Sequence, residues 1–184
     1  MLSLRSYLDA DWWRLQALAE RAPSRRRLGS HFSPRFAPVS LIRVAHALHA
    51  RGWTRCAGFA ALINFVVFGL EVPPRLEIGP GLVIMHTQGT VLGASRIGAN
   101  ATIFQQVTLG AAAADFEFNP SARPIVGDGV TITAGAKVLG PLTLGDGCTV
   151  GANAVVLIDV PPNSLAVGIP ARIVPRATAT EHAA

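Results

Sequence analysis

The sequence predicts a mainly β protein, a solenoid of short strands preceded by a helical segment, and three observations carry this prediction. Aliphatic residues recur every six positions from Ile78 onward. Gly and Asn fill many of the gaps, as in IGAN, VGDG, LGDG and VGAN. The first 70 residues instead space their apolar side chains by three and four, the period of an amphipathic helix. A sustained period of six indicates short strands joined by tight turns, with the aliphatic side chains stacked inside.

The front of the chain contains three apolar segments. SYLDADWWRLQALAE and LIRVAHALHARG have helical spacing, the second ends at Gly52, and the prolines of PRFAPVS separate the two. The third segment, residues 56–70, is apolar almost throughout. It is shorter than the roughly 20 residues that a membrane-spanning helix needs. We therefore expect a buried or interface helix, with peripheral membrane contact as the alternative.

The repeat is interrupted twice. Ile84 and Val91 are seven positions apart, so the rhythm slips by one around His86, and the period fails between Leu109 and Val126. An extra residue in a solenoid must bulge outward, and bulges and excursions re-aim side chains at functional sites. We therefore expect His86 on the outside of a coil, beside a loop formed by residues 111–123.

Charge is unevenly distributed along the chain. Residues 1–60 hold ten arginines and three acidic residues, whereas residues 61–184 hold six basic and eight acidic ones. A basic front is a solvated surface or favours an acidic partner or an anionic membrane surface. No nucleic-acid motif is present, so we expect no nucleic-acid partner.

The cysteines and the first residues bear on the compartment. Cys56 and Cys148 indicate reduced thiols rather than a disulfide framework. Asp9 and Asp11 stand where a signal peptide needs an apolar run. These features predict a cytoplasmic protein, and a place at the inner membrane surface is left open.

Several stretches carry a resemblance to a known family: RVAHALHARGW, FGLEVPPRLEIGPGLVIMHTQGTVLG, IGANATIFQQVTLG and the segment from VGDGVTITAGAKVLG to GIPARIV. They resemble hexapeptide-repeat acyltransferases, above all serine acetyltransferases and their relatives in sugar and polysaccharide O-acetylation. The resemblance implies a left-handed parallel β-helix over residues 71–174, after a helical segment (1–70) and before a loose tail (175–184). It also implies a homotrimer or higher homo-oligomer, because in this family the active sites form between adjacent subunits.

The resemblance implies a catalytic pair. His86 falls at the family's catalytic histidine, and Glu71 falls where serine acetyltransferases carry the aspartate that pairs with it. A neutral imidazole that takes the proton of an attacking hydroxyl contributes about 10²–10⁴ in rate. A carboxylate behind the ring would fix its tautomer and stabilise the imidazolium. We expect direct transfer of an acetyl group from acetyl-CoA to a hydroxyl, with no acyl-enzyme.

Further site residues follow from the same resemblance. Ala134, Gly135 and Ala152 match small residues along which acetyl-CoA lies between subunits, and Arg172 matches a contact for the CoA phosphates. Gln105 and Arg123 are candidates for binding the acceptor. Arg123 offers a planar fork for a carboxylate or phosphate, although a solvated loop arginine is the equal alternative.

The chain departs from serine acetyltransferases at two positions. Met85 replaces the aspartate before the catalytic histidine, and Arg123 replaces a second histidine. A site that binds an ammonium group loses much when a carboxylate becomes a thioether. We therefore predict a small-molecule or glycan acceptor, a sugar hydroxyl on a polysaccharide precursor, with L-serine O-acetylation in cysteine biosynthesis as the alternative.

Two other classes of function are weighed. A zinc enzyme needs several histidines, and residues 71–174 contain only His86, while His46 and His49 lie in the helical front. We expect no metal. A non-catalytic β-helix scaffold is the further alternative, and the presence of both Glu71 and His86 argues against it.

Overall fold

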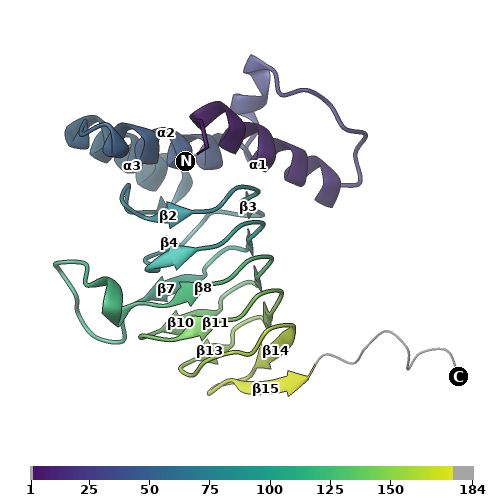
Figure 1. Cartoon of the computed structure of the whole chain (residues 1–184), viewed down its shortest axis with the longest axis vertical. Coiled ribbons are helices and arrows are strands. Elements are labelled where there is room, and N and C mark those ends of the chain that lie inside the picture. The colour runs from purple at the N-terminus through teal and green to yellow at the C-terminus, as the bar shows by residue number, and fades with distance from the viewer. Residues whose placement is uncertain (1, 176–184) are drawn as a thin grey trace, which may run out of the picture.

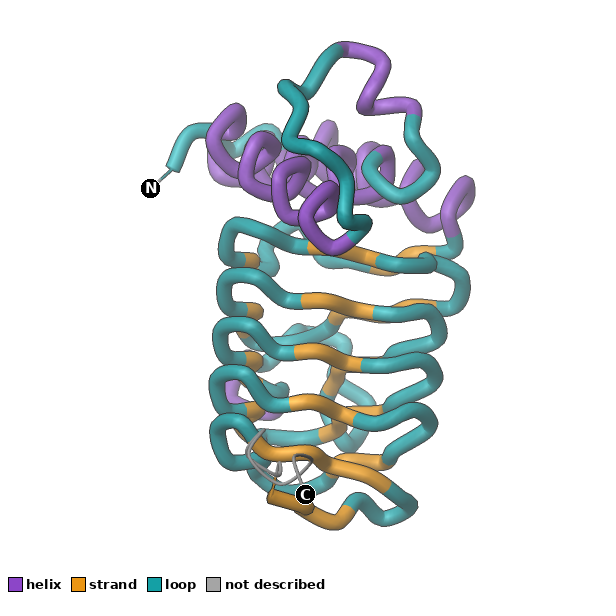
Figure 2. The backbone as a smooth tube through the Cα atoms, turned by 90° about the vertical axis from the view of Figure 1, so that its right-hand side faces the viewer, coloured by secondary structure: helices purple, strands orange, loops and turns teal. Residues whose placement is uncertain are grey.

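A layer of helices lies on one end of a stack of triangular coils (Figures 1 and 2). The structure is a computed structural model, and it describes residues 2–175. The helices end at Phe68 and the strands begin at Leu70. The division of the chain into domains at residue 70 stays a prediction, and the predicted tail, apart from the backbone of Pro175, lies outside the described residues.

The helical layer contains three α-helices and one short 3₁₀ helix: α1 (Leu4–Leu18), η1 (Leu28–Phe32), α2 (Ala37–Ala50) and α3 (Thr54–Phe68). The Ser3 hydroxyl caps α1 by accepting the N–H of Ser6 at 3.1 Å. Gly69 ends α3 in the left-handed region, at φ +63°, and a Cβ there would collide with the side-chain amide of Gln88. This tight passage seats the first strand directly beneath the helices.

No helix within the described residues combines the length and the apolarity that crossing a bilayer requires.

The strands form the three flat faces of the stack. Sheet A contains β1 (Leu70–Glu71), β4 (Thr90–Leu92), β7 (Thr108–Gly110), β10 (Lys137–Leu139) and β13 (Val155–Val156). Sheet B contains β2 (Glu77–Ile78), β5 (Arg96–Ile97), β8 (Ile125–Val126) and β11 (Thr143–Leu144). Sheet C contains β3 (Val83–Ile84), β6 (Thr102–Ile103), β9 (Thr131–Ile132), β12 (Thr149–Val150), β14 (Ser164–Val167) and β15 (Arg172–Pro175).

The chain visits sheets A, B and C in turn, so successive coils pair in parallel, with Ile84 opposite Ile103 and Ile103 opposite Ile132. Among the described strands, only β14 and β15 pair antiparallel. The predicted six-residue aliphatics lie inside the stack and are fully or almost fully buried, apart from Val91. Burying each such side chain stabilises the fold by about 1.5–3 kcal/mol. The helical front and the parallel β-helix are therefore as expected.

The register differs from the prediction at one point. Leu92, not Val91, is buried in the stack and pairs with Leu109, while Val91 is half-buried. The step from Ile84 to the next inward residue is thus two positions longer than the repeat, not one. The turn before β4 absorbs the extra residues, and it is hydrogen-bonded to the end of α3, where Gly89 donates to the carbonyl of Gly69 at 3.0 Å.

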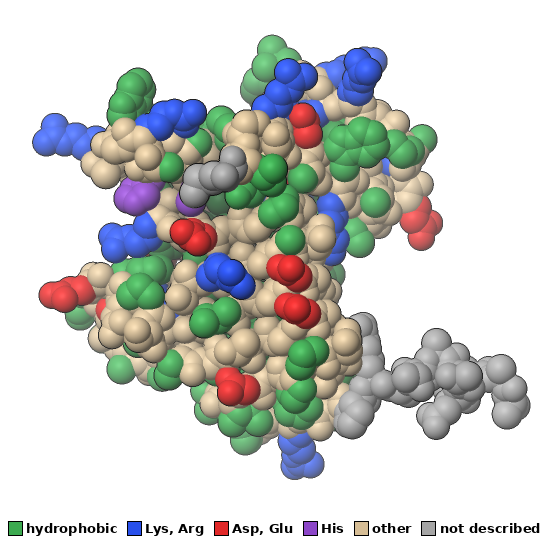
Figure 3. Space-filling view, viewed as in Figure 1, with side chains coloured by type: hydrophobic (Ala, Val, Ile, Leu, Met, Phe, Trp, Pro, Cys, Tyr) green, Lys and Arg blue, Asp and Glu red, His purple; other side chains and the backbone are tan. Residues whose placement is uncertain are grey.

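Charge follows the two layers. Figure 3 shows lysine and arginine side chains gathered mainly over the helices, whereas most acidic side chains of that face lie on the coils. The arginine-rich front of the sequence is thus one end of the molecule.

Candidate active site

His86 lies in the turn that joins β3 to β4, and its side chain is exposed. The backbone of this turn is held at both ends. Met85 donates to the carbonyl of Ile103 at 2.9 Å, and Gln88 accepts the N–H of Gln106 at 3.1 Å. The two extra residues of this turn therefore project outward on a fixed base. Within the described residues, no hydrogen bond or ion pair uses the imidazole of His86.

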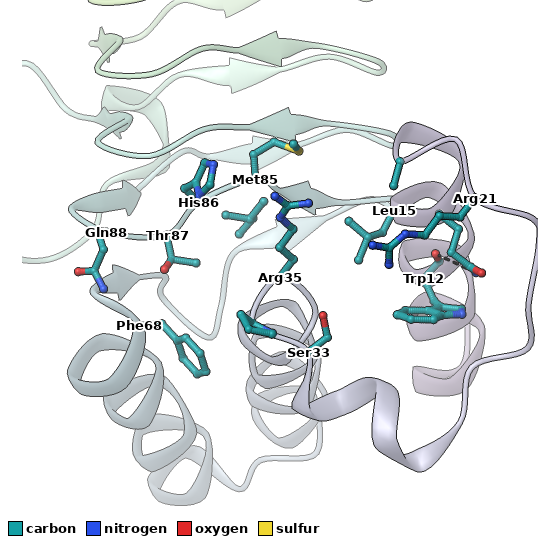
Figure 4. Close-up of a pocket in the computed structure, with 14 residues that line it drawn as sticks. Trp12, Leu15, Arg21, Ser33, Arg35, Phe68, Met85, His86, Thr87 and Gln88 are labelled. Atoms are coloured by element: carbon teal, nitrogen blue, oxygen red, sulfur yellow. Dashed lines mark hydrogen bonds between the residues drawn. The ribbon is translucent and has the colours of Figure 1, made fainter.

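The imidazole faces a cleft of about 630 Å³ between the helical layer and the first coil (Figure 4). Apolar side chains from both layers line it: Trp12, Leu15, Phe68, Ile84 and Met85. The polar lining includes His86, Thr87, Gln88, Arg21 and Arg35. A ligand brought into this cleft would meet the imidazole of His86 in partly apolar surroundings, where electrostatic interactions are stronger than in water.

Glu71 lies in β1, one layer above β4, and is exposed. It lines a shallow hollow against α3, with Leu62 and Phe65, rather than the His86 cleft. No ion pair or hydrogen bond within residues 2–175 joins its carboxylate to His86. The structure therefore shows no polar contact between the two residues, and their catalytic pairing stays a prediction.

Four other predicted residues lie along the same edge of the triangular stack as His86. Gln105, Ala134, Gly135 and Ala152 all belong to turns that lead from sheet C to sheet A. Backbone bonds link the turns: Gly135 donates to Gln105 at 2.9 Å, and Asn153 donates to Ala134 at 2.8 Å. We call this column of turns the His86 edge. Its small side chains leave the backbone accessible to an extended ligand, while the amide oxygen of Gln105 is buried without a partner within the described residues.

Arg172 and Arg123 lie elsewhere. Arg172 is exposed at the start of β15, in the last described layer. Arg123 donates from Nε to Asp115 and from Nη1 to the carbonyl of Gly93, each at 2.9 Å, and it stacks on Phe118. Its guanidinium thus braces the loop of residues 111–123 in this subunit, and its role in acceptor binding stays a prediction.

The loop does not line the His86 cleft in a single subunit. It leaves the stack after β7 and returns at β8, through the short helix η2 (Pro120–Ala122), so it departs from the corner between sheets A and B. His86 occupies the corner between sheets C and A. The expectation that the loop lies beside His86 is therefore not met within one chain.

Sequence reasoning missed the part of the cleft that the helical layer supplies. Trp12, Arg35 and Phe68 line the cleft with His86 from segments far away in sequence. Apolar periodicity predicts that their segments are helical, but it does not predict which residues face the first coil. Nothing in the local sequence distinguishes Arg35 from the other arginines of the front.

No group of three or more His, Cys, Asp or Glu side chains close enough to hold a metal ion occurs in the part of the chain that the structure describes.

Comparisons with known proteins give the family. Residues 123–157 match the family model "Bacterial transferase hexapeptide (six repeats)". Serine acetyltransferase from Helicobacter pylori strain J99 is 41% identical over 133 residues, 72% of this chain and 76% of that enzyme. This chain belongs to the serine acetyltransferase family. It is an acyltransferase.

Solved structures of the family agree with the fold. Soybean serine acetyltransferase in complex with serine has a TM-score of 0.79 and 39% identity, covering 94% of this chain and 70% of that one. A serine acetyltransferase in complex with CoA has a TM-score of 0.76 and 32% identity, covering 92% of this chain and 70% of that one. The helical layer is therefore part of the shared fold.

These relatives correct the predicted acceptor. The prediction of a sugar or polysaccharide hydroxyl is wrong, because the similar enzymes are serine acetyltransferases over most of the chain. That prediction gave too much weight to Met85 and Arg123. It assumed that an amino-acid acceptor must be held at those two positions, although the helical layer also lines the cleft.

Proposed function

We propose that this chain is an acetyl-CoA-dependent L-serine O-acetyltransferase. The observation that carries the proposal is the exposed, unpartnered imidazole of His86 in a cleft of a chain whose relatives are serine acetyltransferases. Acetyl-CoA is the co-substrate, and one similar structure is a CoA complex. L-serine is the acceptor, and another similar structure holds serine.

In the proposed reaction the serine hydroxyl attacks the thioester carbonyl while His86 takes the hydroxyl proton. The new C–O bond gives a tetrahedral oxyanion, which collapses as the C–S bond breaks. The imidazolium returns its proton to the departing thiolate, so the products are O-acetylserine and CoA. Cys148 is buried in the stack, so it does not form an acyl intermediate.

The other predicted site residues have proposed roles that follow from their positions in the fold. Glu71 would orient the imidazole after a rotation of its exposed side chain. Gln105, Ala134, Gly135 and Ala152 lie along the His86 edge, which suits an extended ligand whose thioester must reach His86. Arg172 stands in the last layer, where it would meet phosphates at the far end of CoA.

We infer that the active unit is a homotrimer of left-handed coils, as the family resemblance implies. The loop of residues 111–123 departs from a different corner than the one that carries His86. A neighbouring copy can bring such a loop to the cleft, whereas the same chain cannot. Light scattering that gives a monomeric mass for the active enzyme would overturn this inference.

We also propose a cytoplasmic location with contact to the inner membrane surface. Its support is the exposed apolar face of α3, which comprises Phe59, Leu62, Phe65, Val66 and Val67, beside an arginine-rich layer. Flotation with anionic liposomes tests it. Protein that stays at the bottom of the gradient would remove the membrane contact.

The proposed function is tested by measuring CoA thiol release from acetyl-CoA with and without L-serine, and by identifying the product by mass spectrometry. We expect serine-dependent thiol release in step with O-acetylserine formation. A protein that binds CoA but forms no O-acetylserine would overturn the proposal.

A further inference from the structure

Among the described residues, no acidic side chain lines the His86 cleft. Its charged lining consists of Arg21 and Arg35, together with the titratable His86. An amino-acid acceptor carries a carboxylate and an ammonium group, so this lining offers a full counter-charge to only one of them. The cleft is therefore built to recognise the anionic end of its ligand.

Arg35 is placed better than Arg21 to meet an acceptor at the base. It follows Pro34 in the short segment before α2, and its side chain extends toward Met85 and His86 (Figure 4). Arg21 lies at the other end of the cleft, beside Leu15 and Trp12 (Figure 4). An acceptor whose hydroxyl points at His86 would therefore present its other end to Arg35.

The guanidinium of Arg35 is available. Within residues 2–175 no carboxylate lies within 4.0 Å of it and no hydrogen bond uses it, in contrast to Arg26, Arg43 and Arg123. A guanidinium presents paired N–H donors that match a carboxylate. The side chain of Arg35 is exposed, so a carboxylate that enters the cleft can reach its guanidinium.

We propose that Arg35 anchors the carboxylate of the acceptor, and that the cleft selects hydroxy acids by this carboxylate rather than by an ammonium group. Met85 lines the cleft next to His86, and its thioether offers no charge to an ammonium group. This inference deepens the proposed function and rests on it for the identity of the acceptor. It names a specificity-determining residue and a substrate class.

The substrate class is tested by competition. Glycerate keeps the hydroxyl and the carboxylate of serine but lacks the ammonium, whereas ethanolamine keeps the hydroxyl and the ammonium but lacks the carboxylate. We expect glycerate to bind to the enzyme, by isothermal titration calorimetry, within about threefold of L-serine, and ethanolamine at least about tenfold more weakly. Ethanolamine binding as tightly as glycerate would overturn the proposal.

Arg35 itself is tested with R35Q and R35K, and with R25Q as the matched control. Arg25 is an exposed arginine between α1 and η1 that does not line the His86 cleft. We expect R35Q to raise the KM for L-serine and the dissociation constant for glycerate by about tenfold or more, with kcat within about twofold. R35K should recover part of the loss, because it restores the charge without the planar fork. R25Q should behave as the wild type.

Binding and turnover separate the two proposals. Glycerate binding that depends on Arg35, without acetylation of L-serine, would refute the proposed function and support the anchor. Serine acetylation with a KM that R35Q leaves unchanged would refute the anchor and support the function. A loss of ethanolamine binding in R35Q equal to the loss of glycerate binding would mean a general disturbance of the cleft and would also refute the anchor.

Discussion

Asp11 and Arg43 form a buried ion pair that joins the helical layer to the first coil. Two hydrogen bonds connect them, from Nε at 2.8 Å and from Nη2 at 2.9 Å, and the side chains are 0% and 4% exposed. Asp11 also accepts the N–H groups of Gly81 and Leu82, and Arg43 donates to the carbonyl of Ile78. This pair joins α1 and α2 to the first coil. It therefore fixes the position of the helical layer, which lines one side of the His86 cleft.

Removing one partner of this pair should be costly. Asp11→Ala leaves the guanidinium of Arg43 buried and unpaired, so we expect the free energy of unfolding to fall by about 3–5 kcal/mol. Asp9→Ala is the control, because the Asp9–Arg26 pair is partly exposed and should contribute at most about 1 kcal/mol. Urea unfolding followed by circular dichroism measures both. Equal losses in the two variants would contradict a dominant role for the buried pair.

His86→Ala should remove the general base and leave the binding of CoA intact. We expect kcat to fall by about 10²–10⁴. The check is the initial rate of CoA release with L-serine, beside calorimetric titration of CoA. His49→Ala, at a half-buried position near the end of α2 that does not line the cleft, serves as the control and should retain activity. Full activity in His86→Ala would exclude this residue as the base.

Glu71→Gln tests the catalytic pairing that the structure leaves open. If Glu71 turns toward His86 during the reaction, the amide cannot stabilise the imidazolium, and kcat should fall by about tenfold or more with KM little changed. Glu77→Gln, an exposed acid in β2, is the control. Steady-state kinetics measure both variants. A wild-type kcat in Glu71→Gln would mean that His86 does not depend on the Glu71 carboxylate.

The contact between Asp115 and Arg123, which we call the clasp, should hold the loop of residues 111–123 in place. Burial raises the pKa of Asp115, but hydrogen bonds from the N–H of Asn119 and from Arg123 outweigh this and lower the pKa on balance. Because the pKa of Asp115 is lowered in the folded protein, the stabilisation by the clasp is complete when the pH is above the ordinary pKa of an aspartate. It is lost as the pH falls through the lowered pKa of Asp115. Asp115→Ala should therefore make the loop exchange its amide hydrogens faster at neutral pH. Glu117→Ala, in the same loop, should not.

Cys148 should resist thiol reagents while Cys56 reacts. Burial, reinforced by the charge of Asp146, raises the pKa of the Cys148 thiol to about 11, whereas Cys56 is exposed. The folded state keeps the proton longer than the unfolded chain does, so stability should decline as the pH rises from about 9 toward 11. Native protein should release one equivalent in a thiol titration and unfolded protein two. Cys148→Ala should abolish the decline above pH 9.

The sequence alone was sufficient to predict the stack of coils and the outward position of His86. Side chains such as Ile84, Ile103 and Ile132 must repeat in register, because each coil buries its aliphatics only against the coils above and below. A repeat enforced by burial is visible in one chain, and so is its interruption around His86. The family resemblance placed Glu71 and the residues of the His86 edge, but two local departures outweighed it in the choice of acceptor.

The tertiary structure alone decided what surrounds the base. Arg35 reaches the cleft because α1 and α2 are held on the first coil by Asp11 and Arg43, and no periodic pattern records which side chain of a helix meets a distant turn. Leu92 rather than Val91 lies in the stack, after a turn that is hydrogen-bonded to Gly69 at the end of α3. Packing within a repeat is local and leaves a pattern in the sequence. Docking between two layers depends on contacts among residues far apart in the chain, and those contacts leave no such pattern.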